Sequence, residues 1–175
     1  MKIVAIFDTR LFSFRFPREA DYELKRLQNL WRDPQYIKQF IKDNTSDAPK
    51  NTMPQQLANQ IADDVQKLED YLRDLGNDIN GDFEVFFKQL NNEEYTIKEL
   101  SKRKGRKNYL RLYAIRISEN CFVITGGALK FVHKMNDSDI TKEELKKLER
   151  GRQYLKNNHI HDEDSFYEFL NEEEL

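Results

Sequence analysis

The stretch from Tyr109 to Lys134 is the one segment rich enough in β-forming residues to make the centre of a sheet. Residues 110–117 are almost wholly apolar or aromatic, residues 118–120 are polar and short enough for a tight reversal, and residues 121–125 resume the apolar run. This pattern predicts a β-hairpin around which the rest of the chain is arranged.

Two adjacent glycines, Gly126 and Gly127, interrupt the second run. Such an interruption is typical of a bulge or a sharp bend where a side chain is not tolerated. Residues 128–132 then continue as a third strand-like piece, so this stretch supplies most of the predicted sheet.

Outside this stretch, the spacing of apolar residues and the capping signals predict an N-terminal hairpin and a series of helices. The hairpin strands are expected at 2–7 and 11–16, and the helices are expected to begin near Ala20, Asp33, Leu57, Asp82, Thr96, Thr141 and Asp162. The helix near Thr96 opens with a capping-box spacing and is expected to carry the basic residues up to Gly105.

The predicted fold class is α+β, with a mainly antiparallel sheet of four or five strands. At 175 residues the chain fits a single domain, 1–175. Its sheet core is expected at 2–16 and 109–134, with a helical insertion at 20–100 and C-terminal helices at 141–170.

Composition favours a folded protein in a reducing compartment. Charged residues make up 34% of the chain, but the aromatic content of 12% is too high for a disordered one. The single cysteine, Cys121, permits no intrachain disulfide and is expected in a buried strand, which favours the cytoplasm. No membrane span is expected, because no apolar run reaches about 18 residues. No signal peptide is expected either, because the N-terminal apolar run reaches Asp8 too soon.

The charges are unevenly distributed along the chain. Seven basic residues fall in one short window, opposed only by Glu99: Lys98, Lys102, Arg103, Lys104, Arg106, Lys107 and Arg111. Residues 159–175 contain seven acidic residues and no Lys or Arg. The acidic tail is expected either to fold over the basic cluster or to form a solvated terminal helix.

The basic cluster indicates a surface for nucleic acid, because closely spaced Lys and Arg side chains neutralise phosphates. The neighbouring Tyr95, Tyr109 and Tyr113 are candidates for stacking on bases. The alternative is a solvated, charged face with no ligand. The expected RNA-binding residues are Lys102, Arg103, Lys104, Arg106, Lys107, Arg111 and Tyr113.

A second set of cations projects from the predicted sheet. Side chains alternate along a strand, so Arg116 shares a face with Leu110, and Lys130 shares one with Lys134. If Arg116, Lys130 and Lys134 converge on one surface, they suit phosphoryl chemistry without a metal. The alternative is that they are strand-end charges reaching into solvent.

Other chemical signals are weak. His159 and His161, with Asp162 and Asp164 nearby, fit a polar loop better than a metal site, and Cys121 fits an inert core thiol. The Gly126-Gly127 pair lacks the spacing and the downstream Lys-Ser/Thr of a phosphate-binding loop. No cofactor or metal is therefore expected.

Three segments together resemble the RelE/HigB-type toxins of type II toxin–antitoxin systems. They are Tyr95–Leu100, the strand Leu112-Tyr113-Ala114-Ile115-Arg116, with Ala114 where the family often has an acid, and Phe122–Lys134. The residues 141–157 would then match the C-terminal helix of the family. The resemblance implies a small twisted sheet backed by helices, here with an enlarged N-terminal helical region.

Many members of that superfamily cleave messenger RNA on the ribosome without a metal. The resemblance implies that Arg116 binds or stabilises phosphate and that Lys130, His133 and Lys134 supply charge or proton transfer. It also implies two partners, namely a small antitoxin, usually a helix-turn-helix repressor, and RNA or the ribosome. The sequence leaves open a non-catalytic protein of the same fold that binds nucleic acid or another protein through its basic surface.

Overall fold

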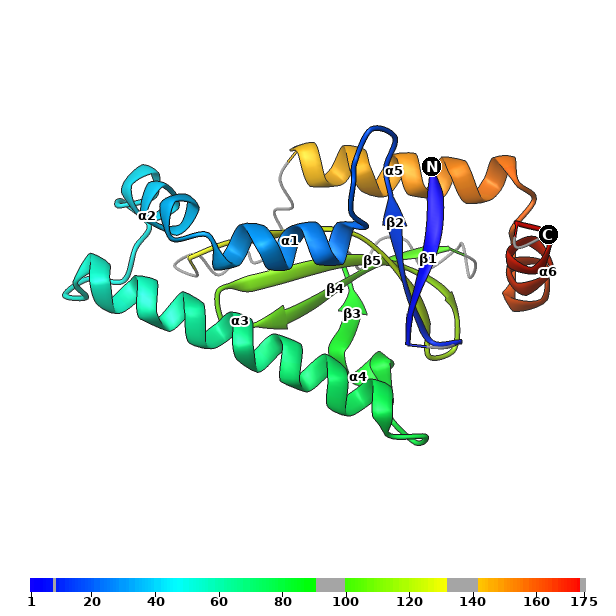
Figure 1. Cartoon of the computed structure of the whole chain (residues 1–175), viewed down its shortest axis with the longest axis horizontal. Helices are drawn as coiled ribbons and strands as arrows, with labels where there is room; N and C mark the ends of the chain where they lie inside the picture. Colours follow the sequence, from blue (N-terminus) through cyan, green and yellow to red (C-terminus); the bar gives the residue numbers. More distant parts are fainter. Residues whose placement is uncertain (8, 91–99, 132–141, 174–175) are drawn as a thin grey trace.

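The computed structural model describes residues 1–7, 9–90, 100–131 and 142–173, and it shows one six-stranded sheet with helices on both faces (Figure 1). The strands are β1 (Lys2–Phe7), β2 (Leu11–Arg15), β3 (Phe87–Gln89), β4 (Ser101–Lys107), β5 (Leu110–Ser118) and β6 (Cys121–Leu129). The helices are α1 (Glu23–Arg32), α2 (Pro34–Asp43), α3 (Pro54–Asn77), α4 (Phe83–Phe86), α5 (Lys142–Asn157) and α6 (Glu163–Glu173).

The strand order is β1-β2-β6-β5-β4-β3, and every neighbouring pair is antiparallel except β2 and β6. The parallel pairing of β2 with β6 attaches the N-terminal hairpin to the central one. The predicted α+β class and the mainly antiparallel sheet are confirmed. The sheet has six strands rather than four or five because β3 and β4 come from the region predicted to be helical.

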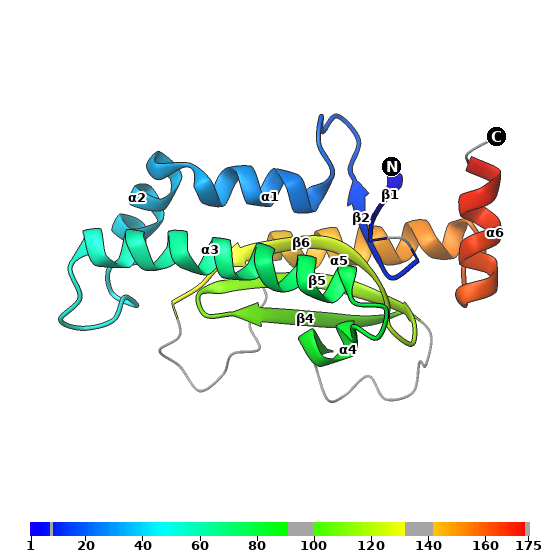
Figure 2. The same cartoon turned by 60° about the horizontal axis from the view of Figure 1, so that its bottom comes forward.

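The central hairpin divides the core into two layers (Figure 2). Leu112 and Ala114 of β5 lie in the apolar cluster formed with α1–α4. Tyr113 and Ile115 lie in the second cluster, formed with α5 and α6. Successive side chains of β5 therefore point to opposite faces of the sheet, as the sequence predicts.

A β-bulge lies where the glycine pair interrupts β6. Tyr113 pairs with Gly126, and the next residue, Ala114, pairs with Ile124, which leaves Thr125 as the extra residue. The Thr125 hydroxyl donates to the Tyr113 carbonyl at 3.2 Å. A Cβ on Gly126 would lie 1.8 Å from Glu144 Oε2, so a side chain there would displace the Glu144 carboxylate of α5. The predicted bulge is confirmed, but β6 continues through it to Leu129 as one strand.

The basic cluster lies on a strand and not on a helix. Seven consecutive residues of β4 pair with β5, from Ser101 opposite Arg116 to Lys107 opposite Leu110. Gly105 is needed in this strand because a Cβ would lie 2.1 Å from Cε1 of Phe86. Pairing with a strong central strand thus overrides the local helical signal. The proposed start of that helix, at Thr96, lies outside the described residues.

Most of the other predicted helices are confirmed. The Asp33 carboxylate caps α2 by accepting from the Gln35 N–H at 2.9 Å, and Asp82 caps α4 by accepting from the Glu84 N–H at 2.8 Å. The long helix α3 carries its predicted apolar stripe into the core. Helix α4 is shorter than expected, because the chain turns into β3 at Phe87.

Ion pairs join α1 to α5 across the edge of β6. Lys147 Nζ lies 2.5 Å from Glu23 Oε1 and 3.2 Å from Glu144 Oε1, and Arg26 also bonds Glu23. Burial raises the pKa of Glu144, although the Lys147 ammonium opposes this shift. These contacts link helices on opposite faces of the sheet.

No helix in the described part of the chain has the length and apolarity that a membrane span requires.

Candidate nucleic-acid interface

The turn between β4 and β5 is held by α3. The fully buried carboxylate of Asp64 accepts from Asn108 Nδ2 at 2.7 Å and from the Tyr109 N–H at 3.2 Å. Asn108 has φ of 46°, a left-handed conformation that asparagine tolerates well. The buried acid therefore fixes the end of the sheet at which the candidate site lies.

Cations from β4 lie on the α5 face of the sheet at this end. Lys104 is opposite Tyr113, which lies in the α5-side cluster, and Arg106 is opposite Arg111. Lys102, on the same face of β4, bonds Glu149 of α5 with an Nζ–Oε1 distance of 2.5 Å. The alternate residues Lys102, Lys104 and Arg106 thus share one face.

A groove runs beside β4, where the short strand β3 no longer covers its edge. The cavity has a volume of about 720 Å³, and none of the described residues that line it is acidic. Five cations and one tyrosine line it: Lys67, Tyr71, Lys88, Lys104, Arg106 and Lys107. Lys107 Nζ lies 4.8 Å from the centre of the Tyr71 ring, a cation–π distance. We call this set the basic groove.

Lys130 lies at the same end of the sheet. Its backbone N–H donates to the Tyr109 carbonyl at 2.9 Å. Tyr109 lies in the turn between β4 and β5, beside which the basic groove lies. A second cavity of about 210 Å³ is lined by Lys130 together with Tyr113, Asp47 and Asn44. The structure therefore brings together two residues that the sequence nominated separately, Lys130 as catalytic and Tyr113 as RNA-binding.

Arg116 does not converge with Lys130. Arg116 pairs with Phe122, whereas Lys130 follows Leu129, which pairs with Leu110 six residues away along β5. At about 3.3 Å per residue this separates them by about 20 Å along the strand. Arg116 also lies on the opposite face, where it forms an ion pair with Glu84 of α4. Arg116 and Lys130 therefore lie on different surfaces, because the register and the bulge in β6 separate them.

Four of the seven predicted RNA-binding residues do not line the basic groove. Arg111 is 1% exposed, and its guanidinium donates back to the Leu110 carbonyl at 2.9 Å. Arg103 lies near Arg116 and Glu84, and burial lowers its pKa. Lys102 is tied to α5 by Glu149. Tyr113 is 2% exposed and reaches only the small cavity beside Lys130.

The predictions for His133, Lys134 and Tyr95 lie outside the described residues. Sequence reasoning missed Lys67, Tyr71 and Lys88 in the basic groove. These residues come from α3 and β3, far from the basic cluster in the chain, so only the sheet order brings them beside it.

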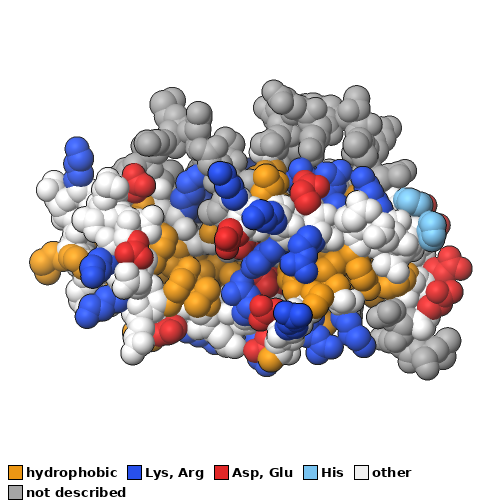
Figure 3. All heavy atoms as spheres, turned by 90° about the horizontal axis from the view of Figure 1, so that it is seen from above, with side chains coloured by type: hydrophobic (Ala, Val, Ile, Leu, Met, Phe, Trp, Pro, Cys, Tyr) orange, Lys and Arg blue, Asp and Glu red, His pale blue; other side chains and the backbone are white. Residues whose placement is uncertain are grey.

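Cys121 lies in the core, as the sequence predicts. Cys121 is 2% exposed, and burial raises the pKa of its thiol to about 12. His159 and His161 are exposed near α6 (Figure 3), and the described residues contain no group of three or more His, Cys, Asp or Glu side chains placed to hold a metal ion.

The acidic tail does not cover the basic groove in the part that is described. Helix α6 packs at the far end of the sheet, where Phe166 contacts Phe12 edge-to-face and the Tyr167 hydroxyl donates to the Thr9 carbonyl at 2.5 Å. The sequence allows the acidic tail either to fold over the basic cluster or to form a terminal helix. The described residues form a terminal helix, and its apolar side packs against the sheet.

Comparisons with protein-family models, with curated proteins and with solved structures found no match to this chain.

Proposed function

We propose that the chain is an RNA-binding protein whose basic groove holds the phosphate backbone, and that it acts as the toxin of a toxin–antitoxin system by cleaving RNA beside Lys130. The observation that carries the proposal is the gathering of Lys104, Arg106, Lys107 and Lys130 at one end of the sheet. The resemblance of the 95–134 region to RelE/HigB-type toxins gives the proposal its reaction class.

The basic groove suits a single-stranded backbone. Its five cations match several successive phosphates, and no acidic residue is among the described residues of the lining. Tyr71 offers an aromatic face for a base, and the base would replace the Lys107 ammonium that now lies over the ring. A groove that combines cations with an aromatic side chain is typical of sequence-tolerant binding to single strands.

Cleavage beside Lys130 requires only proton transfer and charge stabilisation. The ribose 2′-oxygen bonds to the adjacent phosphorus, its proton passes to a base, and the bond from phosphorus to the 5′-oxygen breaks as that oxygen gains a proton. The products are a 2′,3′-cyclic phosphate and a 5′-hydroxyl. The Lys130 ammonium stabilises the negative charge on the pentacoordinate phosphate, and Tyr113, which lines the same cavity, is its proposed partner in proton transfer.

The proposal includes the partners that the resemblance implies. RNA on the ribosome is the substrate, a small antitoxin of the helix-turn-helix type is the inhibitor, and the cytoplasm is the place of action. The gene beside the one that encodes this chain is then expected to encode such a protein.

Induced expression in a bacterial host tests the proposal. The intact chain is expected to arrest growth and to create new RNA ends that carry a 5′-hydroxyl, which ligation-based sequencing detects. Lys130→Ala is expected to abolish both effects while the protein stays folded. Lys156→Ala, an exposed lysine in the last turn of α5, is the matched control and is expected to retain both. Soluble intact protein that causes neither arrest nor new ends would contradict the proposal.

A second function, RNA binding without cleavage, is favoured by one observation. Arg116, one of the four residues predicted to be catalytic, forms an ion pair with Glu84 away from the basic groove. Among the described residues, Lys130 is then the one catalytic candidate that lies beside the basic groove. A binder is expected to lose RNA affinity gradually as cations are removed and to leave RNA intact at every protein concentration. A nuclease loses cleavage but not affinity when Lys130 alone is replaced.

A further inference from the structure

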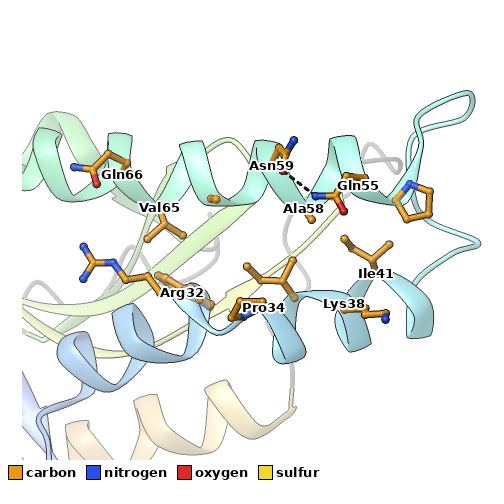
Figure 4. A pocket seen from close by; sticks show the side chains of 13 residues that line it. Arg32, Pro34, Lys38, Ile41, Gln55, Ala58, Asn59, Val65 and Gln66 are labelled. Atoms are coloured by element: carbon orange, nitrogen blue, oxygen red, sulfur yellow. Dashed lines mark hydrogen bonds between the residues drawn. The ribbon is translucent and has the colours of Figure 1, made fainter.

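A second surface, on the opposite face of the sheet from Lys104 and Lys130, has the character of a docking groove. It lies between α3 on one side and the end of α1 with α2 on the other, and its cavity volume is about 520 Å³ (Figure 4). Val65 and Ala58 of α3 face Pro34 and Ile41 across it. We call this surface the helical groove.

The shape of the helical groove fits an elongated occupant. Its lining on α3 runs from Pro54 to Gln66, and at 1.5 Å per residue this is a length of about 18 Å, or some three turns of a helix. Ala58 and Ala62 are one turn apart on this side, and such small side chains let another backbone approach closely. A short helix laid lengthwise satisfies both features.

The charge of the helical groove selects an anionic occupant. Among the described residues, its lining contains two cations, Arg32 and Lys38, and no acidic side chain. Lys38 forms no ion pair with any described residue, whereas Arg32 bonds Glu69. Gln55 and Asn59 add amide groups to the edge and bond each other at 3.1 Å. Carboxylates on the partner would therefore meet an unneutralised Lys38.

The floor of the helical groove contains an unsatisfied donor. Trp31 is fully buried, and its indole N–H has no hydrogen-bond partner among the described residues. A buried donor without an acceptor carries a free-energy cost. Because the Trp31 side chain has no exposed surface, this N–H is not itself a contact for an occupant, and the shape and charge of the groove determine what it binds.

We propose that the helical groove binds an amphipathic, acidic helical segment of a partner protein. The apolar side of that helix would pack on Ile37, Ile41, Ala58 and Val65, and its carboxylates would face Lys38. This proposal does not depend on RNA binding or cleavage, because the helical groove and the basic groove share no lining residue.

Trp31 is the one tryptophan in the chain, so its fluorescence reports directly on the helical groove. The probe is a synthetic 15-residue helical peptide without tryptophan, with leucines on one face and glutamates on the other. A second peptide carries lysine at each glutamate position. The acidic peptide is expected to give a saturable change in Trp31 fluorescence at low ionic strength, at a Kd at least tenfold lower than that of the lysine peptide.

Two variants and one control locate the binding. Lys38→Glu is expected to weaken binding of the acidic peptide about tenfold, and Ala62→Phe, which fills the groove from its exposed edge, is expected to abolish it. Lys42→Glu changes an exposed lysine of the same helix outside the groove lining and is the matched control. Circular dichroism checks that each variant is folded.

Three results would overturn the proposal. Equal affinity for the two peptides would remove the argument from charge, and unchanged binding by folded Ala62→Phe would place the peptide elsewhere. Sedimentation that shows a dimer of the protein alone, lost in Ala62→Phe, would assign the helical groove to a second copy of this chain.

Discussion

The carbonyl of Tyr109 accepts the backbone N–H of Lys130 at 2.9 Å, and this bond places Lys130 next to the turn between β4 and β5. The same turn is anchored to α3 by Asp64, so the basic groove and Lys130 are held at one end of one sheet. Four predictions follow from this arrangement and from the packing around it.

Removal of cations from the basic groove should weaken RNA binding in a salt-dependent way. Lys104→Ala and Arg106→Ala should each lower affinity for single-stranded RNA, and the slope of log affinity against log salt should fall by about 0.7 for each lost phosphate contact. Filter binding across a salt series measures this slope. Lys25→Ala is the control, since Lys25 lies on α1 and is paired with Asp21. A slope that is the same in both variants as in the intact protein would show that RNA does not contact this groove.

Arg116 should contribute to the stability of the fold and not to RNA affinity. Its ion pair with Glu84 joins β5 to α4, and the two side chains are 25% and 26% exposed. A double-mutant cycle with Arg116→Ala and Glu84→Ala should give a coupling free energy of about 0.2–1 kcal/mol in urea unfolding. Neither single variant should change RNA affinity. If folded Arg116→Ala lost RNA affinity and showed no coupling to Glu84, Arg116 would be a residue that contacts RNA.

Gly105 should tolerate no side chain. A Cβ would lie 2.1 Å from Cε1 of Phe86, which is 6% exposed and packs edge-to-face on Phe87. Gly105→Ala should therefore lower the free energy of unfolding by about 1–3 kcal/mol through overpacking. Chemical denaturation measures the change, with Glu119→Ala, at the exposed β5–β6 turn, as the control. A variant as stable as the intact protein would mean that Phe86 does not cover this strand.

The helices of the N-terminal region could be predicted from the sequence because their signals are local. Asp33 caps α2 and Asp82 caps α4 through contacts two residues away, and the apolar stripe of α3 repeats at helical spacing. The hairpin of β5 and β6 could be predicted for the same reason. These features depend on near neighbours, which the sequence displays directly.

Strand β4 and the two grooves could not be predicted, because they depend on pairing between distant residues. The sequence of β4 consists almost entirely of Lys, Arg and Gly, a composition that does not favour a strand, and it is extended because β5 supplies its hydrogen bonds. Lys67 and Lys88 join Lys104 only through the sheet order and the position of α3. The face on which Lys130 lies depends on one extra residue at Thr125.

The Cys121 thiol should be inert in the folded protein. Burial raises its pKa to about 12 from 9.0, so little of the thiolate that reacts with iodoacetamide is present at pH 8. Burial also shields the sulfur atom from the reagent. At pH 8 the labelling rate should follow the rate of unfolding and become fast in urea. Because the pKa in the folded state is the higher one, the folded state also loses stability as the pH rises above about 9 towards 12. Rapid labelling in native buffer would contradict the burial of this residue.

Photo-crosslinking of a single-stranded RNA that contains 4-thiouridine shows which residues of the protein contact the RNA. After digestion, mass spectrometry identifies the peptides that carry a nucleotide. Adducts are expected on the peptides that contain Tyr71 and residues 104–109, and they should disappear when Lys104 and Arg106 are both replaced by alanine. Adducts confined to α6 or to the helical groove, or their persistence in that double variant, would contradict RNA binding in the basic groove.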